Sequence, residues 1–153
     1  MRTIILLLLF ISGAAYSCDY ALGQNLRPFM ESPLFNPAKE PKKPAVIVKI
    51  ERAKSFVASC RQQSFLEIEI QNSAENHSAG YIFKFKTAPI SGLLFPEEPV
   101  VSNGINYFYF SWLESEAELK RPIETTIEII AVLPNGKKSE PIYVRLSSPS
   151  NHH

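Results

Sequence analysis

Several short segments of the chain alternate apolar and polar residues with a period of two, and this pattern constrains the fold more than any other feature. Residues 45–52, AVIVKIER, and residues 64–71, SFLEIEIQ, place aliphatic side chains on one face and mostly charged side chains on the other. Residues 81–87 repeat the pattern with aromatic residues and lysines. Such alternation is typical of a strand with one buried face. Further strands are predicted at residues 106–115, 123–133 and 142–148, with two weak, proline-bounded strands at a sheet edge within residues 88–104.

No long helical pattern interrupts these strands, and residues 114–122 are expected to form a loop or at most a single helical turn. Regular short strands without crossover helices indicate an all-β, antiparallel sandwich of about seven strands that spans residues 45–148. The segment around Tyr107 and Tyr109 is aromatic on both faces. We expect the row of Phe108, Phe110 and Trp112 to face the core, because tyrosine hydroxyls prefer a hydrated position.

The last two predicted strands resemble the final hairpin of fibronectin type III domains. Residues 127–146, IEIIAVLPNGKKSEPIYVRL, share the order of its features: a strand ending near Ala131, a turn at Asn135 and Gly136, and then Ser139 and Pro141. They depart from the family in lacking the usual tyrosine early in the penultimate strand, and the usual tryptophan of the second strand is missing too. The chain is therefore similar to a divergent fibronectin type III or immunoglobulin-like sandwich domain in a small exported protein. That family hosts adhesion, spacer and ligand-binding roles, so the resemblance implies the fold more than the function.

Residues 1–17, MRTIILLLLFISGAAYS, have the layout of a secretory signal peptide. A basic residue precedes an unbroken apolar run at residues 4–11, and small residues follow the run. We expect cleavage after Ser17, with Ala14 and Ala15 as alternative positions. The run is too short for a permanent membrane helix, and no later segment approaches the ~20 apolar residues that a span requires. The mature chain is thus expected to be periplasmic or extracellular.

Charge argues against nucleic acid or an acidic membrane as the partner. The chain carries 16 Lys and Arg against 15 Asp and Glu, a formal net charge of +1, and loss of Arg2 with the signal peptide makes it zero. A nucleic-acid-binding domain usually shows a clear basic excess. The sequence also has no HExxH or CxxC motif and no carboxylate-rich loop, so we expect neither a metal nor another cofactor.

Cys18 and Cys60 are the two cysteines of the chain. Two cysteines in an oxidising compartment usually pair, and this bridge would close a loop of about 43 residues and stabilise the fold by ~4 kcal/mol. Lipidation of Cys18 and free thiols are the alternatives. Residues 18–44 are rich in proline and have little periodicity. If the bridge forms, we expect it to hold this extended leader along the domain, where its apolar residues cover a sheet edge or fill an end of the sandwich. An extended tether is the alternative.

Two pairs of carboxylates are the candidates for catalysis. Glu67 and Glu69 lie on one face of a predicted strand, ~6.8 Å apart along it, and Glu97 and Glu98 lie between two prolines. Glycosidases use two carboxyl groups ~5–9 Å apart, so a small secreted hydrolase that depends on carboxylates is the alternative function. Glutamates that alternate with apolar residues are nevertheless typical of the solvent face of a strand. We therefore expect the chain not to be an enzyme and assign no catalytic residue.

The sequence Asn76-His77-Ser78 is an N-glycosylation motif in a polar segment. We expect a glycan on Asn76 only if the chain is made in a eukaryotic secretory pathway. Residues 149–153 are expected to be a tail, and its two terminal histidines can bind metal weakly, as any exposed pair can.

The hypothesis that the chain binds a partner rests on its aromatic residues. If Tyr107 and Tyr109 lie outside the sandwich with Tyr143 near them, the three form an apolar patch with hydroxyl groups, which suits a protein or glycan partner. The alternative is that the proline-rich leader packs over this patch and buries it. The sequence thus predicts a non-enzymatic, exported module that acts by surface recognition. A structural spacer, anchored by lipid at Cys18, is the third alternative.

Overall fold

The computed structural model describes residues 26–32, 34, 40–53, 63–71, 76, 78–102 and 106–150. Nearly all of the regular structure in these residues is strand, as the alternating pattern predicts. The elements are β1 (Leu26–Pro28), β2 (Ala45–Glu51), β3 (Gln63–Gln71), β4 (Gly80–Phe85), β5 (Val100–Ser102), β6 (Tyr107–Leu113), α1 (Glu116–Leu119), β7 (Ile123–Val132) and β8 (Ile142–Ser148).

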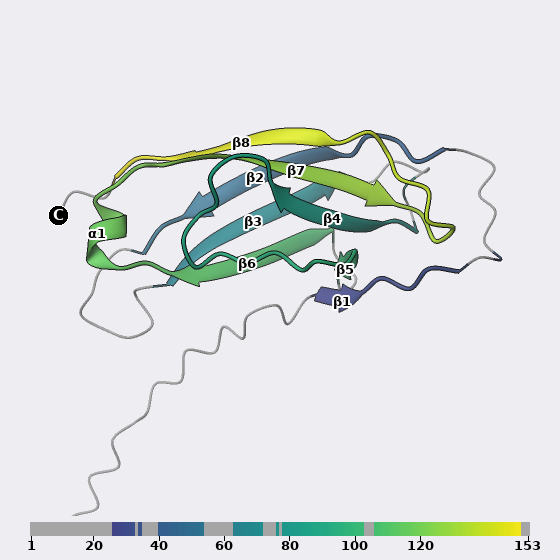
Figure 1. Ribbon diagram of the computed structural model, residues 1–153, viewed down its shortest axis with the longest axis horizontal. Helices are drawn as coiled ribbons and strands as arrows, with labels where there is room; N and C mark the ends of the chain where they lie inside the picture. The colour runs from purple at the N-terminus through teal and green to yellow at the C-terminus, as the bar shows by residue number, and fades with distance from the viewer. Residues whose placement is uncertain are drawn as a thin grey trace, which may run out of the picture.

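The strands form two antiparallel sheets that pack face to face (Figure 1). One sheet has the order β2-β3-β6, and the other has the order β1-β5-β4-β7-β8. Strands β2 and β8 contact each other where the two sheets meet along one side. The prediction of an all-β, antiparallel sandwich is confirmed. Among the described residues, no helix is both long enough and apolar enough to cross a membrane.

The core lies between the sheets and is built from the apolar member of each alternating pair. Phe108, Phe110 and Trp112 are all buried, which confirms the predicted orientation of β6. From the opposite sheet, the ring of Phe83 lies 5.0 Å from that of Phe108. Phe95, in the segment between β4 and β5, packs edge-on against Phe110 at 4.9 Å. Aromatic pairs at such distances stabilise a core beyond the burial of their area.

The predicted weak strands within residues 88–104 need a correction. A single strand, β5, is present in the described part of this segment, and it is not at the edge of its sheet. Strand β1, from the proline-rich leader, pairs with it and takes the edge position, with Leu26 opposite Ser102 and Pro28 opposite Val100. The described residues Leu26–Pro28 of the leader therefore cover a sheet edge. Pro28 suits this place, because an edge strand can tolerate the missing N–H of proline.

The leader stays close to the sandwich beyond β1. The Phe29 N–H donates to the Pro99 carbonyl at 2.9 Å, and the Ser32 N–H donates to the Pro134 carbonyl at 2.6 Å. Gly80 makes room for Phe29, because a Cβ at this glycine would lie 2.4 Å from the Phe29 Cγ. The leader is thus fixed against β4, β5 and the turn that follows β7.

Helix α1 is the single turn expected within residues 114–122. Ser115 caps it: the Ser115 hydroxyl accepts from the Glu118 N–H, and the Glu118 carboxylate accepts from the Ser115 N–H, which is the reciprocal pattern of a capping box. Hydrogen bonds from the Ser115 backbone and from the hydroxyls of Ser91 and Ser115 hold the pKa of Glu118 at about 2. The last hairpin joins β7 to β8, and Gly136 has the positive φ of 80° that its turn requires.

Candidate binding surface

Tyr107 and Tyr109 lie on the outer face of the sheet β2-β3-β6, where the alternation of β6 turns them away from the core. Their neighbours across the strand pairing are charged: Glu69 lies opposite Tyr107, and Glu67 lies opposite Tyr109. Lys49 of β2 lies on the other side of Glu67. We call the surface formed by Lys49, Glu67, Glu69, Tyr107 and Tyr109 the tyrosine face.

The two tyrosine rings form a regular pair. Their centroids are 6.3 Å apart, and their planes differ by 15°. The Glu69 carboxylate raises the pKa of Tyr107, chiefly by its negative charge. Burial raises the pKa of Tyr109, and the charge of Glu67 adds to this shift. Both hydroxyls stay protonated at neutral pH, and each is hydrogen-bonded to the carboxylate opposite it, Tyr107 to Glu69 and Tyr109 to Glu67.

A hollow of about 220 Å³ lies beside Tyr109 and is also lined by Lys49, Glu51, Phe65 and Glu67. The Lys49 ammonium forms an ion pair with Glu51 at 2.5 Å, and the hydrogen bond to this carboxylate raises the pKa of the lysine. Tyr109 is 45% exposed, so the surface is open to solvent. An apolar ring next to carboxylates and a cation can contact a partner through both packing and hydrogen bonds.

The structure does not bring Tyr143 to this surface. Tyr143 lies on β8, in the other sheet, opposite Glu128. It is 51% exposed, and the Lys86 ammonium lies 5.6 Å from its ring centroid. The sequence alone did not show which sheet would carry Tyr143.

Two pairs of carboxylates were candidates for catalysis: Glu67 with Glu69, and Glu97 with Glu98. Neither pair lines the hollow beside Tyr109 together. Glu67 lines the hollow beside Tyr109, but Glu69 does not. Glu97 and Glu98 are both exposed, in the segment that precedes β5. Within the described part of the chain, no cluster of three or more histidine, cysteine, aspartate or glutamate residues could hold a metal ion.

Asn76 is described, and its environment differs from the exposed loop that a glycan would need. Its side chain is 2% exposed. The Asn76 Nδ2 donates to the Lys42 carbonyl at 2.7 Å, and its Oδ1 accepts from the Lys42 N–H at 3.0 Å. These two hydrogen bonds tie Asn76 to the leader. A glycan on Asn76 in a eukaryotic host stays a prediction. Cys18, Cys60, His77 and the two terminal histidines lie outside the described residues.

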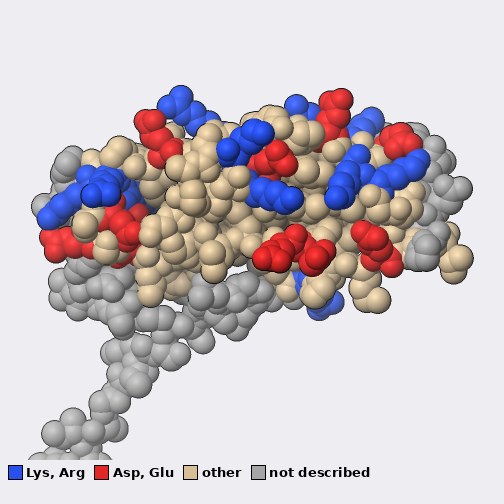
Figure 2. All heavy atoms as spheres, viewed as in Figure 1, with Lys and Arg blue, Asp and Glu red and all other residues tan. Residues whose placement is uncertain are grey.

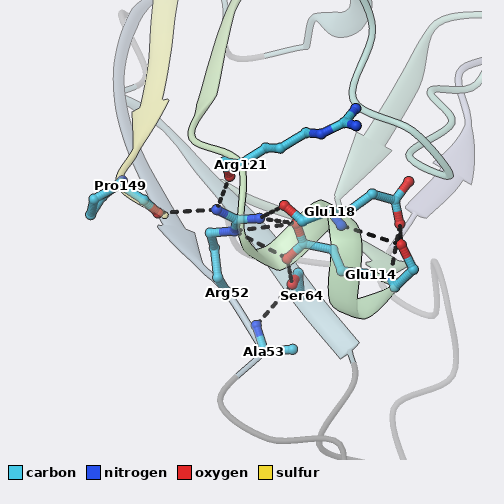
Figure 3. A network of polar contacts seen from close by, with 8 residues as sticks. Arg52, Ala53, Ser64, Glu114, Glu118, Arg121 and Pro149 are labelled. Carbon is cyan, nitrogen blue, oxygen red and sulfur yellow. Dashed lines mark hydrogen bonds and ion pairs between the residues drawn. The ribbon is translucent and has the colours of Figure 1, made fainter. Parts of the chain in front are cut away.

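A buried ionic cluster near α1 was not predicted. Arg52 and Glu114 form an ion pair at 2.6 Å in which each side chain is 3% exposed. The Ser64 hydroxyl donates to the same carboxylate and accepts from the Ala53 N–H. We call Arg52, Ser64 and Glu114 the Arg52 cluster (Figure 3).

Every N–H of the Arg52 guanidinium is engaged. Its Nε and one Nη2 hydrogen bond reach Glu114, and the remaining bonds reach backbone carbonyls that belong to Glu118, Arg121 and Pro149. The side chain of Arg121 extends away from Arg52 (Figure 3). The Arg52 cluster thus joins the ends of β2, β3 and β6 to α1 and to the residue after β8.

Charges of both signs are mixed on the face of the molecule that Figure 2 shows. Figure 2 shows basic and acidic side chains side by side over much of the face in view. A surface of this kind has no extended basic field of the sort that attracts a phosphate backbone.

Comparison with known proteins gives no relative: no family model, no curated protein and no solved structure matches the chain.

Proposed function

We propose that the chain is an exported, non-enzymatic binding module of the fibronectin type III or immunoglobulin-like class. It recognises an envelope or extracellular partner, protein or glycan, through the tyrosine face. The pair formed by Tyr107 and Tyr109, with a carboxylate opposite each ring, is the observation that carries the proposal.

The order of the strands supports the architecture. Without β1, the seven strands β2 to β8 divide into the sheets β2-β3-β6 and β5-β4-β7-β8. The first, second and fifth strands of this set share one sheet, and the other four share the second. This division of the strands is compatible with a fibronectin type III or immunoglobulin-like sandwich. Because such sandwiches host many roles, the function rests on the surface and not on the fold.

The chemistry of the tyrosine face supports recognition. Tyrosine presents a large, rigid contact area at a low cost in conformational entropy, and it is enriched at the centre of protein interfaces. Glu67 and Glu69 accept hydrogen bonds, so sugar hydroxyls or N–H groups of a protein are suitable partners. Residues on rigid strands hold this arrangement in place before a partner arrives, which lowers the entropic cost of binding.

A comparison of two variants tests the proposal. The double variant Tyr107→Ala/Tyr109→Ala removes both rings, while Tyr143→Ala removes an exposed tyrosine from the opposite sheet. Wild-type and variant proteins are immobilised and used to capture partners from the native cell envelope, and they are also applied to a panel of immobilised glycans. We expect the double variant to lose a partner that wild type and Tyr143→Ala both retain. Removal of a central interface tyrosine costs roughly 2 kcal/mol or more, about thirtyfold in affinity.

Binding that survives in the double variant would contradict the proposal, and so would binding that only Tyr143→Ala loses. All three proteins must show the same circular dichroism and thermal midpoint, since the substituted side chains lie on the outside of the sheets. The glycan panel then distinguishes a sugar partner from a protein partner.

A further inference from the structure

The outer face of the sheet β2-β3-β6 carries an excess of negative charge. Within these three strands, the charged residues that face outwards are Lys49, Glu51, Glu67 and Glu69. The single ammonium can neutralise only one of the three carboxylates, and it forms an ion pair with Glu51 at 2.5 Å. The tyrosine face is therefore negative around Glu67 and Glu69, and a surface of this kind is complementary to a positively charged partner.

The two tyrosine hydroxyls of this face are already engaged. Tyr107 is hydrogen-bonded to Glu69, and Tyr109 is hydrogen-bonded to Glu67. An ionised carboxylate has about four positions at which it can accept a hydrogen bond, so each glutamate can still accept from a partner. The tyrosine face thus offers acceptors, and it favours a partner that is rich in N–H donors.

Each tyrosine ring stands beside a carboxylate, and this combination suits a guanidinium better than an ammonium. Glu69 lies opposite Tyr107 and Glu67 lies opposite Tyr109, and side chains in such positions are close neighbours on one face of a sheet. A guanidinium can lie flat on an aromatic ring while its N–H groups bond to a carboxylate in their plane. An ammonium is more strongly hydrated and cannot stack. Each pair of a tyrosine and a glutamate therefore matches one arginine side chain.

The two pairs are spaced like alternate side chains of an extended chain. The ring centroids of Tyr107 and Tyr109 are 6.3 Å apart, and their planes differ by 15°. Side chains two residues apart in an extended segment point to the same side and are ~6.8 Å apart. A segment with the order Arg-X-Arg can thus present one guanidinium to each pair, whereas two adjacent arginines would point to opposite sides.

We propose that the tyrosine face binds an extended, basic protein segment with the order Arg-X-Arg. Each arginine stacks on one tyrosine and bonds to the glutamate opposite it. This inference rests on the function proposed above and names the partner for it. A second copy of the chain does not fit, because it would bring two negative faces together. A neutral glycan would make no use of the charges on Glu67 and Glu69.

Four blocked peptides of five residues test the proposal on the full chain. The probe is Thr-Arg-Thr-Arg-Thr, and Thr-Arg-Arg-Thr-Thr has the same composition with adjacent arginines. The other two carry lysine or citrulline, an uncharged analogue of arginine, at both arginine positions of the probe. Binding is followed at the backbone amides of Tyr107 and Tyr109 in ¹H–¹⁵N spectra. We expect saturable shifts with the probe and binding at least roughly threefold weaker with each of the other peptides.

Two charge-neutral variants localise the effect. Glu67→Gln/Glu69→Gln removes both charges and leaves an acceptor oxygen for each tyrosine hydroxyl. Glu124→Gln/Glu128→Gln removes the same charge from β7, in the other sheet. We expect the first variant to bind the probe at least roughly threefold more weakly than wild type, and the second to bind as wild type does. Circular dichroism shows whether each variant retains the fold.

The proposal is overturned if the probe produces no saturable shift, or if any of the other three peptides binds as tightly. It is also overturned if Glu67→Gln/Glu69→Gln binds the probe as wild type does. In these cases the proposed function still stands where Tyr107→Ala/Tyr109→Ala loses a captured partner, which would then be recognised without charge, as a neutral glycan would be. If no captured partner depends on the two tyrosines, the proposed function fails, and this proposal fails with it.

Discussion

At the scale of single residues, the Arg52 cluster is the most consequential arrangement in the described chain. Burial removes the water that would stabilise each charge, so Arg52 and Glu114 depend on each other and on the surrounding carbonyls. Replacing one partner leaves the other charge buried without compensation. We expect Glu114→Gln to lower the free energy of unfolding by about 3 kcal/mol. Chemical denaturation monitored by circular dichroism measures this loss.

An exposed ion pair provides the matched control. Glu124 and Arg145 approach to 3.4 Å, but their side chains are 65% and 72% exposed. Because water and salt screen such pairs, Glu124→Gln should change stability by less than about 1 kcal/mol. Equal losses in the two variants would show that the Arg52 cluster does not stabilise the fold in the way we describe.

The sequence offered no signal for this cluster. Arg52 ends an alternating segment, and Glu114 begins a run of charged residues, so each has the pattern of an exposed side chain. They are 62 positions apart in the chain, and only the packing of β2 and β6 on the same central strand brings them together. The outward orientation of Tyr107 and Tyr109 could be predicted because the preference of tyrosine hydroxyls for water belongs to each residue alone. The pairing of distant charges depends on the fold and could not be predicted.

At the scale of elements, β1 depends on a contact between Phe29 and Gly80. A methyl group at residue 80 would overlap the Phe29 ring, and overpacking of this kind costs about 1–3 kcal/mol. We expect Gly80→Ala to displace Phe29 and release β1 from β5. Hydrogen exchange at the Phe29 amide, which is bonded to the Pro99 carbonyl, should then accelerate, while amides of β3 keep their protection.

A double variant separates this effect from a general weakening of β4. In Phe29→Ala/Gly80→Ala the clash with the ring is absent, and only the contact with the Phe29 Cβ, at 2.7 Å, remains. The two substitutions together should therefore cost less than the sum of their separate effects. If the two costs simply add, then Gly80 does not act through Phe29, and the leader is held by other contacts.

The strands differ in how well the sequence alone predicted them. Alternation located β2, β3 and β4, because a period of two lies within each strand. Aromatic or β-branched segments bounded by turn residues located β6, β7 and β8. Neither signal could locate β1, since Leu26–Pro28 is too short to show a period and becomes a strand only by pairing with β5. The polar residues around Asn76 predicted an exposed loop, but contacts with Lys42 bury the side-chain amide. Lys42 lies in a different segment, so the local sequence did not show this burial.

At the scale of the whole molecule, the leader is attached to the sandwich by several separate contacts. Strand β1 pairs with β5, Glu40 forms an ion pair with Lys137 at 2.5 Å, and Lys42 is held by Asn76. Each contact is weak alone, because short edge pairing and exposed ion pairs contribute little. A covalent bond between the leader and the sandwich would keep the two close together, so each of these weak contacts would form more readily. We expect a bridge between Cys18 and Cys60 to have this role.

The bridge and export can be tested together on the protein recovered from its native host. We expect the intact mass to show a chain that begins at Cys18 and that gains two hydrogens on reduction. Because the bridge constrains the unfolded chain, reduction should lower the free energy of unfolding by ~4 kcal/mol, and Cys18→Ser should have the same effect without reduction. A mass increment of the size of a diacylglycerol would instead identify Cys18 as a lipid anchor. A chain that retains Met1 with two reactive thiols would contradict both export and the bridge, and the tyrosine face would then meet its partner inside the cell.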